Sequence, residues 1–373
     1  MHNIKYLFLL FILVLTSCED SSRKKSASNG IQLILQDSIV VDYVGDLYLR
    51  DYHESLDRYL SFDQHNGMVV EFDSIGNITY QFNPTIEGPD GIEGELVALS
   101  YFQDSLFLVQ SMMGYYAFNR NSQKVNYYKP NITSSLYSNM KYNIESNDAA
   151  IFSMRTNGTD IRMTEKAYYK EAKQLTVVKT KPDTSHFLAV NFEENSIYRN
   201  PTHFYYYSYP AFDYNPSDSL IYIVYSMDKN IYAYDPSDDF ELKKTIQTSP
   251  SFFNDPIKTP FGKQPHTIKS LAYGSAYHNI LSNGKYTILE YYTALPEEID
   301  LPGSIAELNE LYLMYNQYYY ELFYEGGKLG EVELPEGKFG MHILKEDGTI
   351  FFQLDKNKYE RDYEIFYEYK ILF

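Results

Sequence analysis

The sequence of 373 residues contains a single cysteine, Cys18, and no tryptophan. One cysteine excludes a disulfide within the chain, so burial must hold the fold together, and a chain of this length is ample for that. The lack of tryptophan removes the usual first choice for stacking on sugar rings. The chain also has no metal-spaced His/Cys cluster, no HExxH, no GxSxG and no glycine-rich phosphate loop. We therefore expect no metal and no cofactor.

Positive charge is also scarce. The chain has 32 Lys and Arg against 50 Asp and Glu, a formal net charge of −18. Binding to nucleic acid or to an anionic membrane surface depends on positive charge. The composition therefore predicts no nucleic-acid partner. We interpret the excess of acidic residues as a source of solubility, in preference to an acidic binding face.

Long apolar runs are missing too. The longest, at the N-terminus, covers residues 6–15 after Lys5. Ten residues at about 1.5 Å each span only half of a ~30 Å hydrocarbon core, so this segment predicts a secretory signal and not a spanning helix. It ends in Leu-Thr-Ser-Cys18, which resembles the bacterial lipobox. That resemblance implies cleavage after residue 17, acylation of Cys18 and a lipid anchor in the membrane; an ordinary signal peptide is the alternative. Residues 18–30 are polar and predict a flexible tether.

Tyrosine and phenylalanine are abundant, with 40 and 23 copies, and they recur in hairpins. Each hairpin has two strands of alternating apolar residues around a polar turn. Four hairpins of this kind cover residues 66–82, 114–128, 230–246 and 318–334. Another strand pair usually precedes each one, so the repeating unit is four short antiparallel strands. Repeats of about 40–50 residues with four strands are typical of β-propeller blades.

The length of the chain predicts six or seven blades, and we expect six, in a single propeller domain over residues 31–373. A β-sandwich is the alternative fold. An insertion or an irregular third blade is expected between about residues 130 and 205. The strand at 31–44 is expected to close the ring beside the C-terminal sheet, which removes two exposed edges. One helix is expected at 304–315, where Ser304 and Glu307 form a capping pair. It is expected to pack on one face of the ring, with a lid over a ligand as the alternative.

The lipobox, the hairpin "VVEFDSIGNITYQF" and the loop "NPTIEGPDGIEG" together resemble six-bladed propeller-like lipoproteins of the Bacteroidota, in a family known only as a domain of unknown function. The resemblance implies a propeller anchored in the cell envelope, at the outer membrane. Whether the protein faces the periplasm or the cell surface stays open. The resemblance carries no catalytic residues.

In propellers, the loops that enter the innermost strands gather at one end of the axis, where ligands usually bind. Here these loops are 83–95, 198–210 and 248–267. They combine opposite charges with imidazoles, a set that could bind a polar ligand. The candidate ligand-binding residues are Glu87, Asp90, Glu93, Arg199, His203, Tyr205, Lys263 and His266.

These features favour a non-catalytic binding module, with a glycan or a protein as the expected partner. A hydrolase or lyase acting on glycans is the first alternative, because propeller enzymes draw their residues from several blades. A purely structural envelope component is the second. Facing carboxylates in the central mouth would favour the enzyme, and tyrosines with neutral groups would favour binding.

Overall fold

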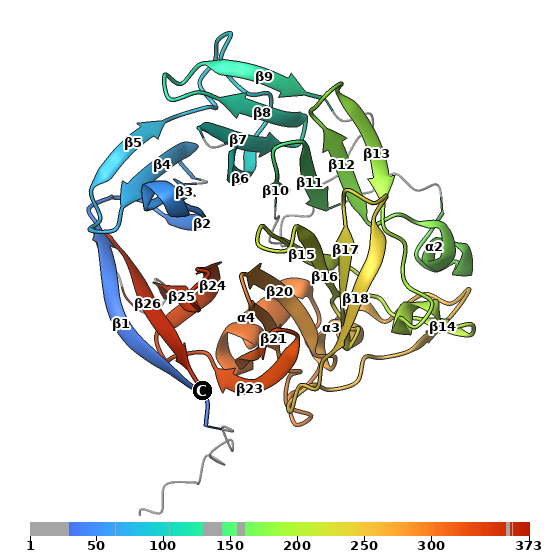
Figure 1. Ribbon diagram of the computed structural model, residues 1–373. Coiled ribbons are helices and arrows are strands. Elements are labelled where there is room, and N and C mark those ends of the chain that lie inside the picture. The colour runs from blue at the N-terminus through green and yellow to red at the C-terminus, as the bar shows by residue number, and fades with distance from the viewer. Residues whose placement is uncertain are drawn as a thin grey trace, which may run out of the picture.

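The strands of the computed structural model form six four-stranded antiparallel sheets, arranged as blades around a common axis (Figure 1). The six-bladed β-propeller expected from the repeats is confirmed, and the β-sandwich alternative is wrong. The structure describes residues 30–63, 65–103, 105–129, 144–154, 161–355, 359 and 361–373. Cys18 and the predicted signal lie outside these residues, so their roles stay predictions.

Each blade starts with a strand beside the axis and ends at the rim, and the strands below follow that order. Blade 1 contains β2 (Leu47–His53), β3 (Arg58–Asp63), β4 (Met68–Asp73) and β5 (Ile78–Phe82). Blade 2 contains β6 (Leu96–Phe102), β7 (Leu106–Ser111), β8 (Gly114–Phe118) and β9 (Lys124–Tyr128). Blade 3 contains β10 (Ile144–Ser146), β11 (Ala150–Met154), β12 (Leu175–Lys179) and β13 (Ser185–Ala189).

The second half of the chain repeats this plan. Blade 4 contains β15 (Pro210–Asn215), β16 (Leu220–Tyr225), β17 (Asn230–Asp235) and β18 (Glu241–Gln247). Blade 5 contains β20 (Ala276–Asn283), β21 (Tyr286–Tyr292), β22 (Tyr318–Tyr324) and β23 (Gly327–Glu333). Blade 6 contains β24 (Lys338–Leu344), β25 (Thr349–Leu354), β26 (Glu364–Leu372) and β1 (Gln32–Val41).

Short elements connect the blades or their strands. The helical ones are η1 (Glu54–Leu56), α2 (Lys166–Glu171), η2 (Ile197–Arg199), α3 (Thr267–Ala272) and α4 (Ile305–Tyr315). A two-stranded sheet pairs β14 (His203–Phe204) with β19 (Thr259–Pro260). This small sheet joins two of the loops that were expected to carry the ligand site. None of the helices in the described ranges has the length and apolar character needed to cross a membrane.

Burial changes from strand to strand within a blade. All six residues of β16, "LIYIVY", are buried, whereas the rim strand of the same blade, β18 with the sequence "ELKKTIQ", has no buried residue. A middle strand packs against neighbouring blades on both faces, so it reads as a continuous apolar run. A rim strand meets solvent and carries charge.

The ring is closed by strands from opposite ends of the chain. β1 pairs antiparallel with β26, with Gln32 opposite Leu372 and Val41 opposite Glu364 (Figure 1). The closing strand predicted at 31–44 is therefore confirmed. It buries Ile39 and Val41 against blade 1 and covers an edge that would otherwise stay unpaired.

The irregular third blade is also found, with α2 inserted between β11 and β12. The helix predicted at 304–315 is present as α4, and the Ser304 hydroxyl accepts the Glu307 N–H at 3.2 Å. Leu308 is buried against the segment around α3, while Ile305 remains exposed.

The two ends of the ring differ. We call the end at which the inner strands finish the exit end, and the opposite one the entry end. α4 follows β21, whose last residue Tyr292 pairs with Ala276 at the start of β20. The helix therefore lies at the entry end.

Candidate functional site

A cavity of about 460 Å³ opens on the axis at the exit end. Residues in or just after the inner strands of all six blades line it. These strands surround the axis of the ring (Figure 1). Its charged and polar lining includes Arg50, Asp51, Ser100, Glu145, Asp213, Ser282 and His342. α4 lies at the other end of the ring and does not cover this cavity.

Two of the lining residues occupy β-bulges. The pairing of β2 with β3 skips Arg50, and the pairing of β24 with β25 skips His342. A bulge inserts one residue and re-aims its side chain, and bulges are common beside functional sites. These bulges lie on adjacent blades, where His342 Nδ1 is 3.1 Å from the carbonyl oxygen of Leu49.

Arg50 has no hydrogen-bond acceptor and no carboxylate partner among the described residues, and its Nε atom is fully buried. Its guanidinium lies 5.0 Å from the centre of the Phe62 ring, a cation–π contact. Burial lowers the pKa of Arg50 to about 10. A partly buried positive charge without a counter-ion is costly, so this residue stands out in the cavity.

The carboxylates Asp51 and Asp213 occupy similar places in blades that face each other across the ring. The Tyr101 N–H donates to Asp51 Oδ2 at 2.7 Å, and the Ser282 N–H donates to Asp213 Oδ2 at 2.5 Å. Each aspartate therefore ties its inner strand to that of the next blade. Asp51 also accepts the N–H of Tyr52 at 2.7 Å, which occupies its second oxygen.

Both aspartates hold their protons unusually strongly. Burial raises the pKa of Asp51 to about 6 and that of Asp213 to about 7, and the charge of Asp51 contributes to the second shift. The side chain of Glu145, on the neighbouring blade 3, is hydrogen-bonded to Asp213. A hydrogen bond between two carboxyl groups requires a proton on one of them, and the raised pKa of Asp213 agrees with that.

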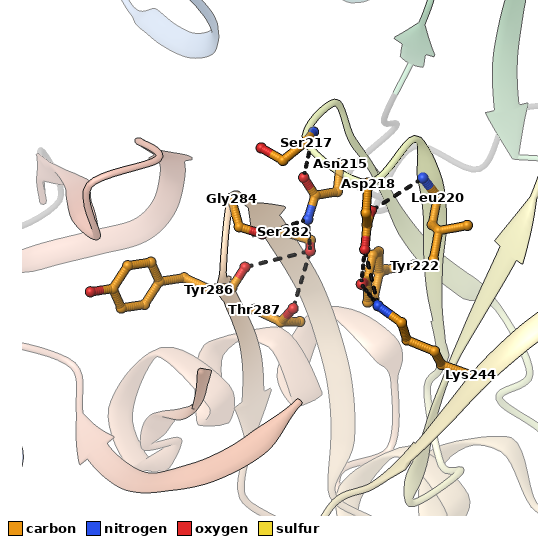
Figure 2. A network of polar contacts seen from close by, with 10 residues as sticks. All are labelled: Asn215, Ser217, Asp218, Leu220, Tyr222, Lys244, Ser282, Gly284, Tyr286 and Thr287. Carbon is orange, nitrogen blue, oxygen red and sulfur yellow. Dashed lines mark hydrogen bonds and ion pairs between the residues drawn. The ribbon is translucent and has the colours of Figure 1, made fainter. Parts of the chain in front are cut away.

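The wall of the cavity between blades 4 and 5 is fixed by a polar network (Figure 2). The Asn215 amide donates to Ser282 Oγ at 3.3 Å and to the Gly284 carbonyl at 3.0 Å. Ser282 Oγ in turn lies 3.1 Å from Thr287 Oγ1. The hydroxyl of Ser282, whose N–H donates to Asp213, is thus held by Asn215 on blade 4 and Thr287 on blade 5. This wall of the cavity is therefore preformed.

None of the eight sequence-predicted ligand residues lines this cavity. Glu87 and Asp90 lie instead in a smaller hollow of about 220 Å³ at the junction of blades 1 and 2, where Asp90 Oδ1 accepts the Lys124 N–H at 3.0 Å. Glu93 and Lys263 are exposed. Their predicted role in binding stays a prediction.

The remaining candidates make local contacts. His203 Nε2 lies 3.0 Å from the hydroxyl of Tyr205, so the structure brings these two together. Arg199 forms an ion pair with Glu194, and His266 caps α3 by accepting the Lys269 N–H at 3.3 Å. The eight residues are therefore dispersed over the loops and do not converge on one centre.

Sequence reasoning missed the residues of the axial cavity, although a signal for them exists. Arg50 and Asp51 stand inside "LYLRDYH", Asp213 inside "PAFDYN" and His342 inside "KFGMHIL". The ends of the inner strands surround the axis, so a charged or imidazole residue in such a strand is a candidate for lining an axial cavity. No group of three His, Cys, Asp or Glu side chains within the described ranges is placed to hold a metal ion.

No protein-family model matches the chain, and no curated protein matches it. Among solved structures, a DUF4221 family member from Bacteroides vulgatus aligns with a TM-score of 0.69 and 12% identity, covering 92% of this chain and 99% of its own. A Bacteroides fragilis protein whose name marks it as exported aligns at 0.54 with 13% identity, covering 94% and 98%. Virginiamycin B lyase from Staphylococcus aureus aligns at 0.44 with 10% identity, covering 92% and 100%.

The resemblance to six-bladed propellers of the Bacteroidota, inferred from the lipobox, the hairpin and the loop, is confirmed for the fold, while the lipid anchor stays a prediction. At identities this low the shared property is the fold, and activity has to be argued from the cavity itself.

Proposed function

We propose that this protein is an exported lipoprotein of the bacterial envelope whose propeller binds a small polar ligand, without catalysis, in the axial cavity. The observation that carries the proposal is Arg50, a partly buried guanidinium without a partner in a preformed cavity. Folded proteins pair their buried charges, so an unpaired one in a cavity favours a ligand as the missing partner.

Facing carboxylates alone would favour an enzyme, but the hydrogen bonds that these groups already make support the non-catalytic proposal. Both oxygens of Asp51 accept backbone N–H groups, and Asp213 Oδ2 accepts another from the next blade. A general base needs a lone pair aimed at the substrate, and a carboxylate committed to backbone donors has lost much of that capacity. The two carboxylates are therefore better suited to lining a binding site than to acting as a general base.

A glycan-acting hydrolase is the second candidate, and the Asp213–Glu145 pair favours it. Two carboxyl groups in one cavity, one of them protonated near neutral pH, are the elements of acid–base hydrolysis. Product formation distinguishes this candidate from binding.

The export and anchoring part of the proposal rests on the N-terminal sequence. The apolar run and the lipobox-like ending at Cys18 support a cleaved signal and a lipid anchor. The exported protein of Bacteroides fragilis with the same fold is a further reason to expect this compartment. An outer-membrane site, facing the periplasm or the cell surface, belongs to the same proposal.

The test uses the chain from residue 19 onward, purified and screened against glycans, peptides, amino acids and small carboxylates. Each compound is scored for a shift in melting temperature and, by chromatography, for conversion. A shift without conversion that is lost in Arg50→Met supports the binding function. Conversion abolished in Asp213→Asn would replace it with the enzyme, and no shift with any compound would favour the purely structural role.

A further inference from the structure

We infer that the axial cavity takes a small amphoteric organic molecule, with its carboxylate on Arg50 and its amino group facing the Asp213–Glu145 pair. The inference rests on the proposed binding function and names the class of ligand. It follows from the way charge is distributed over the walls of the cavity.

One wall supplies unused donors. Arg50 has no acceptor in the described part of the chain, and a planar guanidinium matches a carboxylate with two parallel hydrogen bonds. Ser100, on the adjacent inner strand, is 4% exposed, and its hydroxyl also has no partner. The bond from the Tyr101 N–H to Asp51 holds these two strands together, so Arg50 and Ser100 lie near the same level of the cavity. They form a donor pair suited to one carboxylate.

The opposite wall carries two carboxyl groups, Asp213 and Glu145, with no cationic side chain beside them among the described residues that line the cavity. Asp213 on blade 4 is hydrogen-bonded to Glu145 on blade 3, a contact that two ionised carboxylates could not make. This hydrogen bond needs a proton on one of the two carboxyl groups, which that proton neutralises, and the proton would pass to solvent when a cationic ligand binds. A ligand ammonium group would take the place of this proton, since it offers three donors and compensates the charge of the ionised pair.

The two walls together exclude simpler ligands. A plain anion would satisfy Arg50 but would also meet Asp51, Asp213 and Glu145, which line the same cavity. A plain cation would leave Arg50 without a partner. Only a molecule with both charges satisfies both walls, and a volume of about 460 Å³ suits an amino acid or a short peptide.

The alternative is that Arg50 is structural and satisfied by its contact with the Phe62 ring. The two ideas predict opposite effects of Arg50→Met on the empty protein. Loss of an unpaired buried charge leaves the melting temperature unchanged or raises it, whereas loss of a structural cation lowers it.

The experiment is calorimetric titration of the chain from residue 19 with glycine, beta-alanine, gamma-aminobutyrate and glycylglycine, beside butyrate and butylamine as matched single-charge probes. At least one amphoteric probe is expected to bind about tenfold more tightly than either single-charge probe. Arg50→Met and Asp213→Asn should each remove that advantage. Lys285→Met, on an exposed ion pair with Glu325, should leave binding unchanged.

Three results would overturn the inference. If butyrate binds as tightly as gamma-aminobutyrate, and Asp213→Asn has no effect, the site takes a simple carboxylate, and the proposed binding function survives. If only glycans or other neutral compounds bind, the ligand class is wrong while the binding function again stands. If nothing binds and Arg50→Met melts at a lower temperature, both the inference and the proposed function fail.

Discussion

The junction of blades 1 and 2 contains a buried ion pair whose rupture should be costly. Glu71, in β4, is 1% exposed and receives both guanidinium nitrogens of Arg120, at 3.0 Å and 2.7 Å. The hydroxyls of Thr79 and Tyr101 also donate to it, at 2.7 Å and 3.1 Å. Arg120 and Tyr101 belong to blade 2, so this carboxylate joins two blades.

Replacing Arg120 with alanine leaves the Glu71 carboxylate buried without its cation. Breaking a buried pair in this way costs about 3–5 kcal/mol. We expect about 3 kcal/mol, because the Arg120 side chain is 40% exposed and the two hydroxyl donors remain. Glu71→Gln should cost less, since it removes the charge along with the need for a partner. The loss of stability in the double variant should therefore be about 2 kcal/mol smaller than the sum of the losses in the two single variants.

Urea unfolding followed by circular dichroism and tyrosine fluorescence measures these differences; the lack of tryptophan leaves the 40 tyrosines as the intrinsic fluorophores. Lys285→Ala is the matched control, because Lys285 and Glu325 form an ion pair in which the side chains are 61% and 57% exposed. Its loss should cost at most about 0.5 kcal/mol. Additive losses for the single and double variants, or equal losses for Arg120→Ala and Lys285→Ala, would refute the reasoning.

The same pair carries a pH signature. Burial alone would raise the pKa of Glu71, but the hydrogen bonds and charge of Arg120, with Thr79, lower it below its ordinary value. Its stabilisation is therefore present above the unfolded value of about 4.5 and is lost as the pH falls through the folded value. In Arg120→Ala the Glu71 carboxyl can protonate more readily. The difference in the free energy of unfolding between this variant and the wild type should therefore narrow as the pH falls from 7 towards 5.

Three further predictions concern the cavity, the ring closure and the anchor. Burial raises the pKa of Asp213 to about 7, so the contribution of this group to stability should fall as the pH rises from about 4 to 7, by up to about 1.4 kcal/mol per pH unit. The difference in melting temperature between the wild type and Asp213→Asn should therefore change with pH in thermal melts, and a difference that is independent of pH would contradict the assignment. Deleting residues 31–41 exposes the edge of β26 and removes Ile31, Ile39 and Val41, which are at most 2% exposed. The expected loss of about 5 kcal/mol or more in the free energy of unfolding approaches the stability of a typical domain. We therefore expect aggregation in size-exclusion chromatography or a much lower melting temperature. A monomer with an unchanged melting temperature would count against ring closure. Cys18→Ala should move the protein from the membrane to the soluble fraction after cell lysis, and persistent membrane association would disprove lipid anchoring.

The sequence by itself determined the architecture. Middle strands such as "LIYIVY" pack on both faces and must be apolar throughout, whereas rim strands such as "ELKKTIQ" face solvent. The repeat of four strands can therefore be recognised in the amino-acid sequence. Ring closure by residues 31–44 also followed from the sequence, because an open ring leaves two unpaired edges and only one spare strand was available. The capped helix at 304–315 followed from local chemistry at Ser304.

Only the tertiary structure revealed the axial cavity. The sequence favoured the loops at the entry end, because long polar loops are easy to see, but the charged cavity lies at the exit end and is built from single residues of separate blades. Arg50 and His342 reach the axis through bulges, which a strand pattern does not reveal. Asp213 and Glu145 are 68 positions apart in the sequence and meet only because blades 3 and 4 are neighbours. Their hydrogen bond and the raised pKa of Asp213 depend on proximity and burial, which exist only once the ring has closed.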